Sequence, residues 1–169
     1  MLYDLLKICV SIFFNILNKL LGGKLPPFCS AAIIVEEQDH YLVIELPRGR
    51  VVFPGGFSTW QETPGQTAER EGKEETGYLL HIGDMIGYYA SPSYQLTTMS
   101  TTCIVYAGRI IGGELKNNME GHPRWLHENE LRQRLSAHSR MILDDYLRYR
   151  SVQRAKAGSL KTSTLALAS

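Results

Sequence analysis

The chain has 169 residues, a formal net charge of +1 at pH 7 and a hydrophobic content of 44%. This length and composition predict one globular domain with its own core, and the near-neutral charge argues against a surface that binds nucleic acid. Cys9, Cys29 and Cys103 are widely spaced without a C-x-x-C pair, which argues against a disulfide framework or a zinc site and favours the reducing cytoplasm.

The first 24 residues are typical of an amphipathic helix. Most of them are apolar, and at 100° per residue the polar ones form one narrow stripe: Asp4, Lys7, Ser11, Asn15, Asn18 and Lys19. Polar residues interrupt the run of about 20 apolar residues that a spanning helix needs, and no cleavage site follows directly, so a membrane span or a secretory signal is the least favoured reading.

Two other readings of residues 1–24 stay open. The helix lies on a membrane surface, where Lys7, Lys19 and Lys24 would favour anionic lipid, or it packs on the domain or on a second subunit as a homodimer contact. Gly22 and Gly23 would end the helix in either case.

After Pro26 and Pro27 the hydrophobic pattern changes from helical to strand periodicity. Apolar and β-branched runs predict strands at 31–35, 40–46, 51–53, 82–90 and 98–109. Helices are predicted at 64–77, 128–135 and 138–149. This order indicates an α/β sandwich with a mixed sheet. The predicted organisation is a helix at 1–24, a domain at 26–150 and a flexible tail at 151–169, which is rich in Ser, Ala, Lys and Thr.

The helix predicted after the third strand has strong boundary signals. Thr63 is a good N-cap residue, Pro64 suits the first helical position, and Gln66 completes a capping box. Gly77 can take the left-handed conformation that ends helices. The helix is therefore expected to begin at about Pro64 and to stop near Gly77.

Three carboxylates share one face of this helix. Glu71, Glu74 and Glu75 are three and four residues apart, so they repel one another unless a cation neutralises them. Carboxylate oxygens together with substrate phosphates are the ligands that Mg²⁺ prefers in proteins. The pattern predicts a divalent metal site for a phosphorylated ligand, against the alternative of an ordinary solvated surface helix.

The full spacing of residues 56–78, GFSTWQETPGQTAEREGKEETGY, resembles the Nudix box, the signature of Nudix hydrolases. The resemblance implies the Nudix fold, an α/β/α sandwich with a mixed β-sheet. It also implies Mg²⁺, with Mn²⁺ as the alternative, and hydrolysis of the diphosphate bond of a nucleoside diphosphate linked to another group. One position departs from the family pattern: Gly72 stands in place of an aliphatic residue, and a glycine inside a helix costs about 1 kcal/mol relative to alanine.

The same resemblance assigns roles to individual residues. It implies that the metal ligands are the Gly55 carbonyl and the side chains of Glu71, Glu74 and Glu75. Arg70 matches the arginine that orients the glutamates, and Glu62 matches an outer glutamate that supports the site. Glu120, in the sequence Glu-Gly-His-Pro-Arg-Trp, looks like the catalytic base of MutT-type members, against the alternative of an ordinary loop carboxylate.

The specificity signals are weaker. Tyr94 lies two positions after Pro92 of a Ser-Pro pair that resembles a segment of ADP-ribose and nucleotide-sugar hydrolases. Its ring is suited to stack on a base, against the alternative that the aromatic residues of this stretch belong to the core. Arg48 and Arg50 are suited to bind substrate phosphates, or they are turn charges. The expected substrate is a small molecule, of the ADP-ribose or sugar-nucleotide type ahead of MutT-type nucleoside triphosphates. The rival hypothesis is a Nudix-fold sensor that binds a nucleotide without cleaving it, although such sensors typically lose box glutamates that this chain retains.

Overall fold

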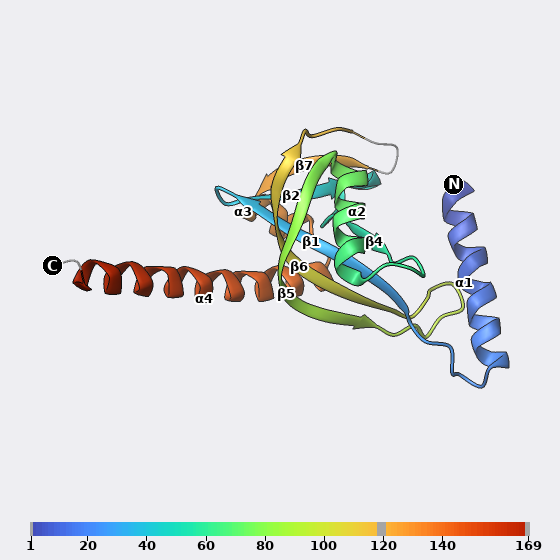
Figure 1. Cartoon of the computed structure of the whole chain (residues 1–169). Helices are drawn as coiled ribbons and strands as arrows, with labels where there is room; N and C mark the ends of the chain where they lie inside the picture. Colours follow the sequence, from blue (N-terminus) through green and yellow to red (C-terminus); the bar gives the residue numbers. More distant parts are fainter. Residues whose placement is uncertain (1, 118–120, 168–169) are drawn as a thin grey trace.

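A computed structural model describes the backbone of residues 2–117 and 121–167 (Figure 1). After an N-terminal helix come a group of strands, one helix, a second group of strands and two consecutive helices. In chain order they are α1 (Leu2–Leu20), β1 (Phe28–Glu37), β2 (His40–Glu45), the 3₁₀ turn η1 (Pro47–Gly49), β3 (Val51–Val52), β4 (Gly55–Phe57), α2 (Pro64–Thr76), β5 (Tyr78–Ser91), β6 (Thr101–Gly113), β7 (His122–His127), α3 (Glu128–Arg134) and α4 (Ala137–Leu167).

The strands form one mixed sheet in the order β3-β2-β1-β6-β5, with β4 paired to β1 and β7 paired to β2. β1 and β6 run parallel, and the other pairs are antiparallel. Helix α2 packs on one face, against β1 and β5, and α3 and α4 cover the other face (Figure 1). The predicted α/β/α sandwich with a mixed sheet is thereby confirmed.

Strand β1 contributes side chains to a hydrophobic core on each face of the sheet. Its side chains alternate across the sheet, so Ala31, Ile33 and Val35 pack under α2, with Ala68 of that helix. Ile34 points the other way, into the cluster that α3 and α4 close. A strand that is buried on both faces has a continuous apolar sequence, and this is the pattern from which β1 was predicted.

Two strands have no counterpart among the predicted elements. β4 is only three residues long and contains Gly55 and Gly56, which have no side chains from which a periodicity can be read. β7 pairs with β2 along its whole length but includes Pro123 and three charged or histidine positions. Both strands are held by backbone pairing to β1 and β2, which propensity alone does not reveal.

The C-terminal segment also differs from its prediction. Residues 151–167 continue helix α4, where a flexible tail was expected after Arg150. The part from Ser151 to Ala157 is largely exposed, so no apolar face repeats along it. Hydrophobic periodicity detects helices that pack on one side, whereas the Ala, Lys and Arg residues of this segment favour a helix by propensity alone.

Helix α1 contacts the domain. The Asn15 side chain donates hydrogen bonds to the carbonyls of Leu96 and Thr98 at 3.2 and 2.8 Å, and the Phe14 ring meets Phe28 of β1 edge-on at 4.6 Å between centroids. The helix ends at Leu20, and Gly22 and Gly23, both with positive φ, form the turn after it, where the sequence predicts the helix end. No helix in the described part of the chain is long and apolar enough to cross a membrane.

Gly72 lets α2 approach the sheet closely. A Cβ atom at this position would lie 2.5 Å from Cδ1 of Leu80 and 3.4 Å from Cγ2 of Ile33. Leu80, on β5, therefore fills the space in which the family has an aliphatic side chain. The departure from the box pattern is accommodated by the packing of this one leucine.

Gly72→Ala is expected to lower the free energy of unfolding by about 1–2 kcal/mol, because overpacking against buried Leu80 outweighs the gain of about 1 kcal/mol in helix propensity. Adding Leu80→Val removes the clashing atom, so the double variant should be more stable than the sum of the two single effects predicts. Urea unfolding of all four proteins measures this. A Gly72→Ala protein more stable than the wild type would show that Leu80 moves aside freely.

Candidate active site

The helix that carries the carboxylates is fixed at both ends. The Thr63 hydroxyl accepts a hydrogen bond from the Gln66 backbone N–H, and the Gln66 side chain accepts one from the Thr63 N–H at 2.9 Å. At the other end Gly77 is left-handed, and its N–H donates to the Lys73 carbonyl. The observed limits of α2 match the predicted ones, since both caps are local features of the sequence.

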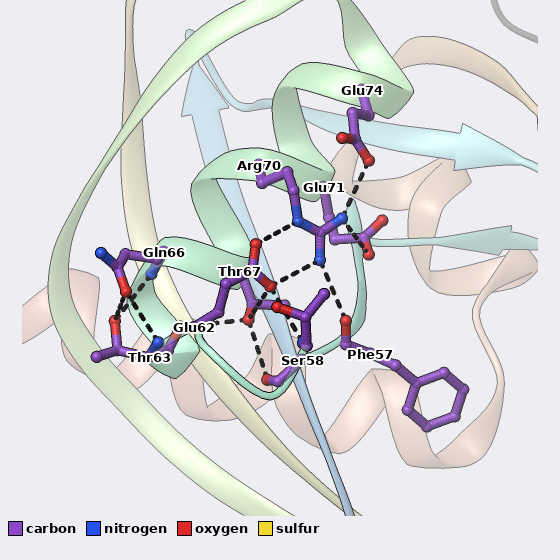
Figure 2. A network of polar contacts seen from close by, with 10 residues as sticks. Phe57, Ser58, Glu62, Thr63, Gln66, Thr67, Arg70, Glu71 and Glu74 are labelled. Carbon is purple, nitrogen blue, oxygen red and sulfur yellow. Dashed lines mark hydrogen bonds and ion pairs between the residues drawn. The ribbon is translucent and has the colours of Figure 1, made fainter.

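Arg70 lies at the centre of the polar network (Figure 2). Its Nε and Nη2 donate to the two oxygens of Glu62, at 2.6 and 3.0 Å. Nη1 donates to Glu71 Oε1 at 2.8 Å and to Glu74 Oε2 at 3.0 Å, while Nη2 also reaches the Phe57 carbonyl at 3.2 Å. One planar guanidinium thus sets the positions of three glutamates, which a lysine cannot do.

Glu62 is held by further donors from the loop before α2. The Thr59 N–H donates to its Oε2 at 3.2 Å. The Thr67 hydroxyl lies within hydrogen-bond distance of the same oxygen, at 3.2 Å, and of the Ser58 hydroxyl, at 3.0 Å. The hydrogen bonds from Arg70, followed by that from Thr59, lower the pKa of Glu62 from its ordinary 4.5 to about 2. Thr67 and Ser58 were not predicted as site residues; the only sequence signal is a polar β-branched residue four positions after the N-cap.

The lowered pKa of Glu62 predicts the pH range in which this carboxylate stabilises the folded protein. A carboxylate whose pKa is depressed on folding contributes stability that is complete above its unfolded pKa and is lost as the pH falls through the folded one. The stability difference between the wild type and Glu62→Gln should therefore be constant above about pH 5, shrink below 4.5 and vanish near 2. Denaturant unfolding from pH 7 to 2 measures it. A difference that is already lost at pH 4 would contradict the Arg70 contact.

The strand β4 passes directly beside two of the carboxylates. The Gly55 N–H donates to Glu75 Oε2 at 2.8 Å. A Cβ on Gly56 would lie 2.4 Å from the carboxyl carbon of Glu71, so only a residue without a side chain fits there. Glu75 is buried and Glu74 is exposed. The two glycines therefore seat Glu75 and Glu71 between the helix and the sheet.

The carboxylate oxygens on α2 are the type of ligand that a hard divalent cation requires. Glu71, Glu74 and Glu75 supply carboxylate oxygens on one helix face, and two of them adjoin the Gly55 and Gly56 backbone. Among the described residues, no three acidic, histidine or cysteine side chains are already gathered closely enough to hold a metal ion. Arg70, at hydrogen-bond distance from Glu71 and Glu74, supplies the positive charge at this point.

The other predicted site residues come from separate loops. Arg48 and Arg50 are exposed around η1, whose Gly49 carbonyl accepts a hydrogen bond from Arg134 of α3. Tyr94 is exposed on the loop between β5 and β6. No hydrogen bond or ion pair joins these three residues to the box glutamates within the described part of the chain. Glu120 lies outside the described residues.

Comparisons with known proteins agree with this architecture. The family model of the NUDIX domain matches residues 27–146. An ADP-ribose pyrophosphatase of Methanocaldococcus jannaschii is 29% identical over 122 residues, covering 70% of this chain and 72% of that protein. A MutT-like protein of Streptomyces ambofaciens is 28% identical over 116 residues, covering 66% and 72%.

Solved structures share the fold. A NUDIX hydrolase from Nitrosomonas europaea superposes with a TM-score of 0.64 at 22% identity, covering 72% of this chain and 88% of that one. A UDP-X diphosphatase gives a TM-score of 0.63 at 16% identity, covering 82% and 72%. Since the family model spans well over half of its length, the chain belongs to the Nudix family and is a Nudix pyrophosphohydrolase.

Proposed function

We propose that the protein is a Mg²⁺-dependent hydrolase that cleaves the diphosphate bond of a nucleoside diphosphate linked to another group. The observation that carries this proposal is the cluster of box glutamates arranged around Arg70 and seated against Gly55 and Gly56. A binding module without hydrolysis would have no need for three carboxylates on one helix face, whose mutual repulsion a metal ion relieves.

The proposed metal ligands are the side chains of Glu71 and Glu75, with Glu74 and the Gly55 carbonyl as further ligands. The bound ion would neutralise diphosphate charge and lower the pKa of a bound water. The chain itself prepares the ligands: Arg70 orients Glu71 and Glu74, and the Gly55 N–H holds Glu75. Mn²⁺ offers similar oxygen-preferring chemistry and is the alternative ion.

Glu62 has a supporting role in this proposal, because its carboxylate faces Arg70 through two hydrogen bonds and so fixes the guanidinium. Glu120 is proposed as the catalytic base. It lies outside the described residues, two positions before His122, the first residue of β7 in the sequence. A general base acts within hydrogen-bond reach of the attacking water.

For the substrate we favour ADP-ribose or a sugar nucleotide over a nucleoside triphosphate. The relative from Methanocaldococcus jannaschii is named an ADP-ribose pyrophosphatase, which supports the first class. Tyr94 has an exposed ring available to stack on a base, and Arg48 and Arg50 are exposed cations available to phosphates. We place the enzyme in the reducing cytoplasm, because its three cysteines are all free thiols.

The test is product release from ADP-ribose, sugar nucleotides, dinucleoside polyphosphates and nucleoside triphosphates, with Mg²⁺ or Mn²⁺, for the wild type and Glu71→Gln. Cleavage of one class that requires the metal and disappears in the variant supports the proposal and identifies the linked group. A folded protein that binds a nucleotide in calorimetry but cleaves nothing with either ion would favour the sensor instead.

A further inference from the structure

Helix α1 is oriented with its polar side toward the protein. Ser11 is buried, the Asn15 amide donates to the carbonyls of Leu96 and Thr98, and the Asn18 side chain accepts a hydrogen bond from the Leu25 N–H at 3.0 Å. An amphipathic helix on a globular domain normally buries its apolar face and exposes its polar one. In α1 the middle of the polar stripe, at Ser11, Asn15 and Asn18, faces the protein instead.

The opposite side of α1 is apolar and exposed. At 100° per residue, the side directly opposite the polar stripe carries a row of side chains at spacings of three and four. The row consists of Leu5, Cys9, Phe13, Ile16 and Leu20, and every one of these residues is exposed. We call these five residues the outer row. By helical spacing they form a continuous apolar strip along α1. The helix itself lies at the margin of the domain (Figure 1).

We propose that the outer row of α1 seats the protein on an anionic lipid surface, with the helix axis lying in the plane of the membrane. α1 has 19 residues, with an apolar side and a polar stripe on the opposite side, which is typical of a helix that lies in the membrane interface. Its polar residues argue against a span of the bilayer, and no helix among the described residues combines the length and apolarity that crossing requires.

The charge of this segment favours anionic lipid. Residues 1–24 contain three lysines and one aspartate. Lys19, in the last turn of α1, and Lys24, just beyond it, are both exposed. Lysines at the border of an apolar face can reach up to phosphate headgroups while the apolar side chains enter the acyl region, and each basic residue near an anionic surface strengthens the attraction.

The size of the outer row argues against a second copy of the chain as its partner. A 19-residue helix is about 28 Å long and about 10 Å across, so its outer side has a footprint of roughly 300 Å². A stable protein interface buries about 800 Å² per partner. The helix alone falls well short of that area, whereas insertion into a lipid surface has no such threshold and can surround the row from three sides.

The neighbourhood of α1 extends the apolar surface toward the active site. Leu96, whose carbonyl is held by Asn15, is itself exposed. Phe14 of α1 contacts Phe28, and Phe28 lies 6.2 Å from the half-exposed ring of Phe57. The Phe57 carbonyl in turn accepts a hydrogen bond from Arg70. Lipid contact through α1 would therefore hold the active site beside the membrane surface.

The experiment is sedimentation of the full-length protein with vesicles of phosphatidylcholine alone or mixed with phosphatidylserine, at low and high salt. The test variant is Phe13→Glu/Ile16→Glu, whose positions are 62% and 51% exposed. The matched control is Ile111→Glu/Val152→Glu, at positions 60% and 52% exposed on β6 and α4. The mass of each protein in solution is measured by light scattering, and circular dichroism checks that each is folded.

We expect the wild type and the control to bind the mixed vesicles, more weakly at high salt, and the test variant to lose at least about tenfold in bound fraction. Three results would overturn the proposal: a wild type that does not sediment with mixed vesicles, equal binding by the test variant, or an equal loss in the control. A wild-type dimer that the test variant converts to a monomer, without vesicle binding by either, would assign the outer row to a second copy.

Discussion

Glu75→Gln is expected to abolish hydrolysis while leaving the fold intact. Glutamine has the shape of glutamate, and its side-chain oxygen can still accept the hydrogen bond from the Gly55 N–H. The variant loses the negative charge that binds the cation, and with it about 4 kcal/mol of transition-state stabilisation, which corresponds to a fall in kcat of about 10³-fold. Steady-state kinetics on the substrate found in the panel, beside thermal unfolding, measure both parts of this prediction.

The natural control is Glu74→Gln. Glu74 is also on the carboxylate face and also contacts Arg70, but its side chain is 59% exposed, whereas Glu75 is buried. A partly solvated carboxylate can be replaced by water in the coordination of Mg²⁺, so we expect a loss of about tenfold at most. If Glu75→Gln retained activity within tenfold of the wild type, Glu75 would be a structural carboxylate and the proposed ligand set would be wrong.

The two ends of α2 were predictable because each is decided by neighbouring residues. The Thr63 and Gln66 pair and the left-handed Gly77 need no tertiary information, and the helix begins and ends where these signals place it. The α/β/α architecture followed from the alternation of apolar strands with a helix and from the resemblance of residues 56–78 to the Nudix box. These features are local, or they repeat along the chain.

The seating of the carboxylates was not predictable from periodicity. β4 consists of Gly55, Gly56 and Phe57 and exists because its backbone pairs with β1. The contact of Gly56 with Glu71 joins residues 15 positions apart in sequence across the gap between strand and helix. Likewise, Gly72 looks like a weak point in the helix until Leu80, on the next strand, is seen to occupy the space beside it.

The orientation of α1 on the domain is a third feature that the sequence does not predict. The sequence defines a polar stripe and an apolar side, but both sides have possible partners, and burial of apolar surface is the usual default. Here Asn15 donates to the carbonyls of Leu96 and Thr98, and Asn18 accepts from the N–H of Leu25. No sequence pattern marks these backbone groups as partners of the helix. Such contacts reverse the default and leave the outer row exposed.

Gly56→Ala is expected to disable the site without unfolding the protein. The backbone of Gly56 has no positive φ, so alanine is compatible with its conformation in β4. Its methyl group would meet the Glu71 carboxylate at 2.4 Å, and Glu71 must turn away and lose its 2.8 Å contact with Arg70. We expect kcat to fall by about 10–100-fold and the affinity for Mn²⁺, measured by calorimetry, to weaken in parallel, as is typical when a ligand loses its orientation.

The control for this variant is Gly83→Ala on β5, where the new methyl group would meet only an ordinary contact of 3.4 Å with the Ala107 carbonyl. Its activity should equal that of the wild type. A compensating change sharpens the test: Glu71→Asp withdraws the carboxylate by one methylene, so adding Gly56→Ala to Glu71→Asp should cost little further activity. If Gly56→Ala were fully active, or if its effect were undiminished beside Glu71→Asp, the methyl group would not act through Glu71, and the Gly56 seat would have no part in positioning the metal ligand.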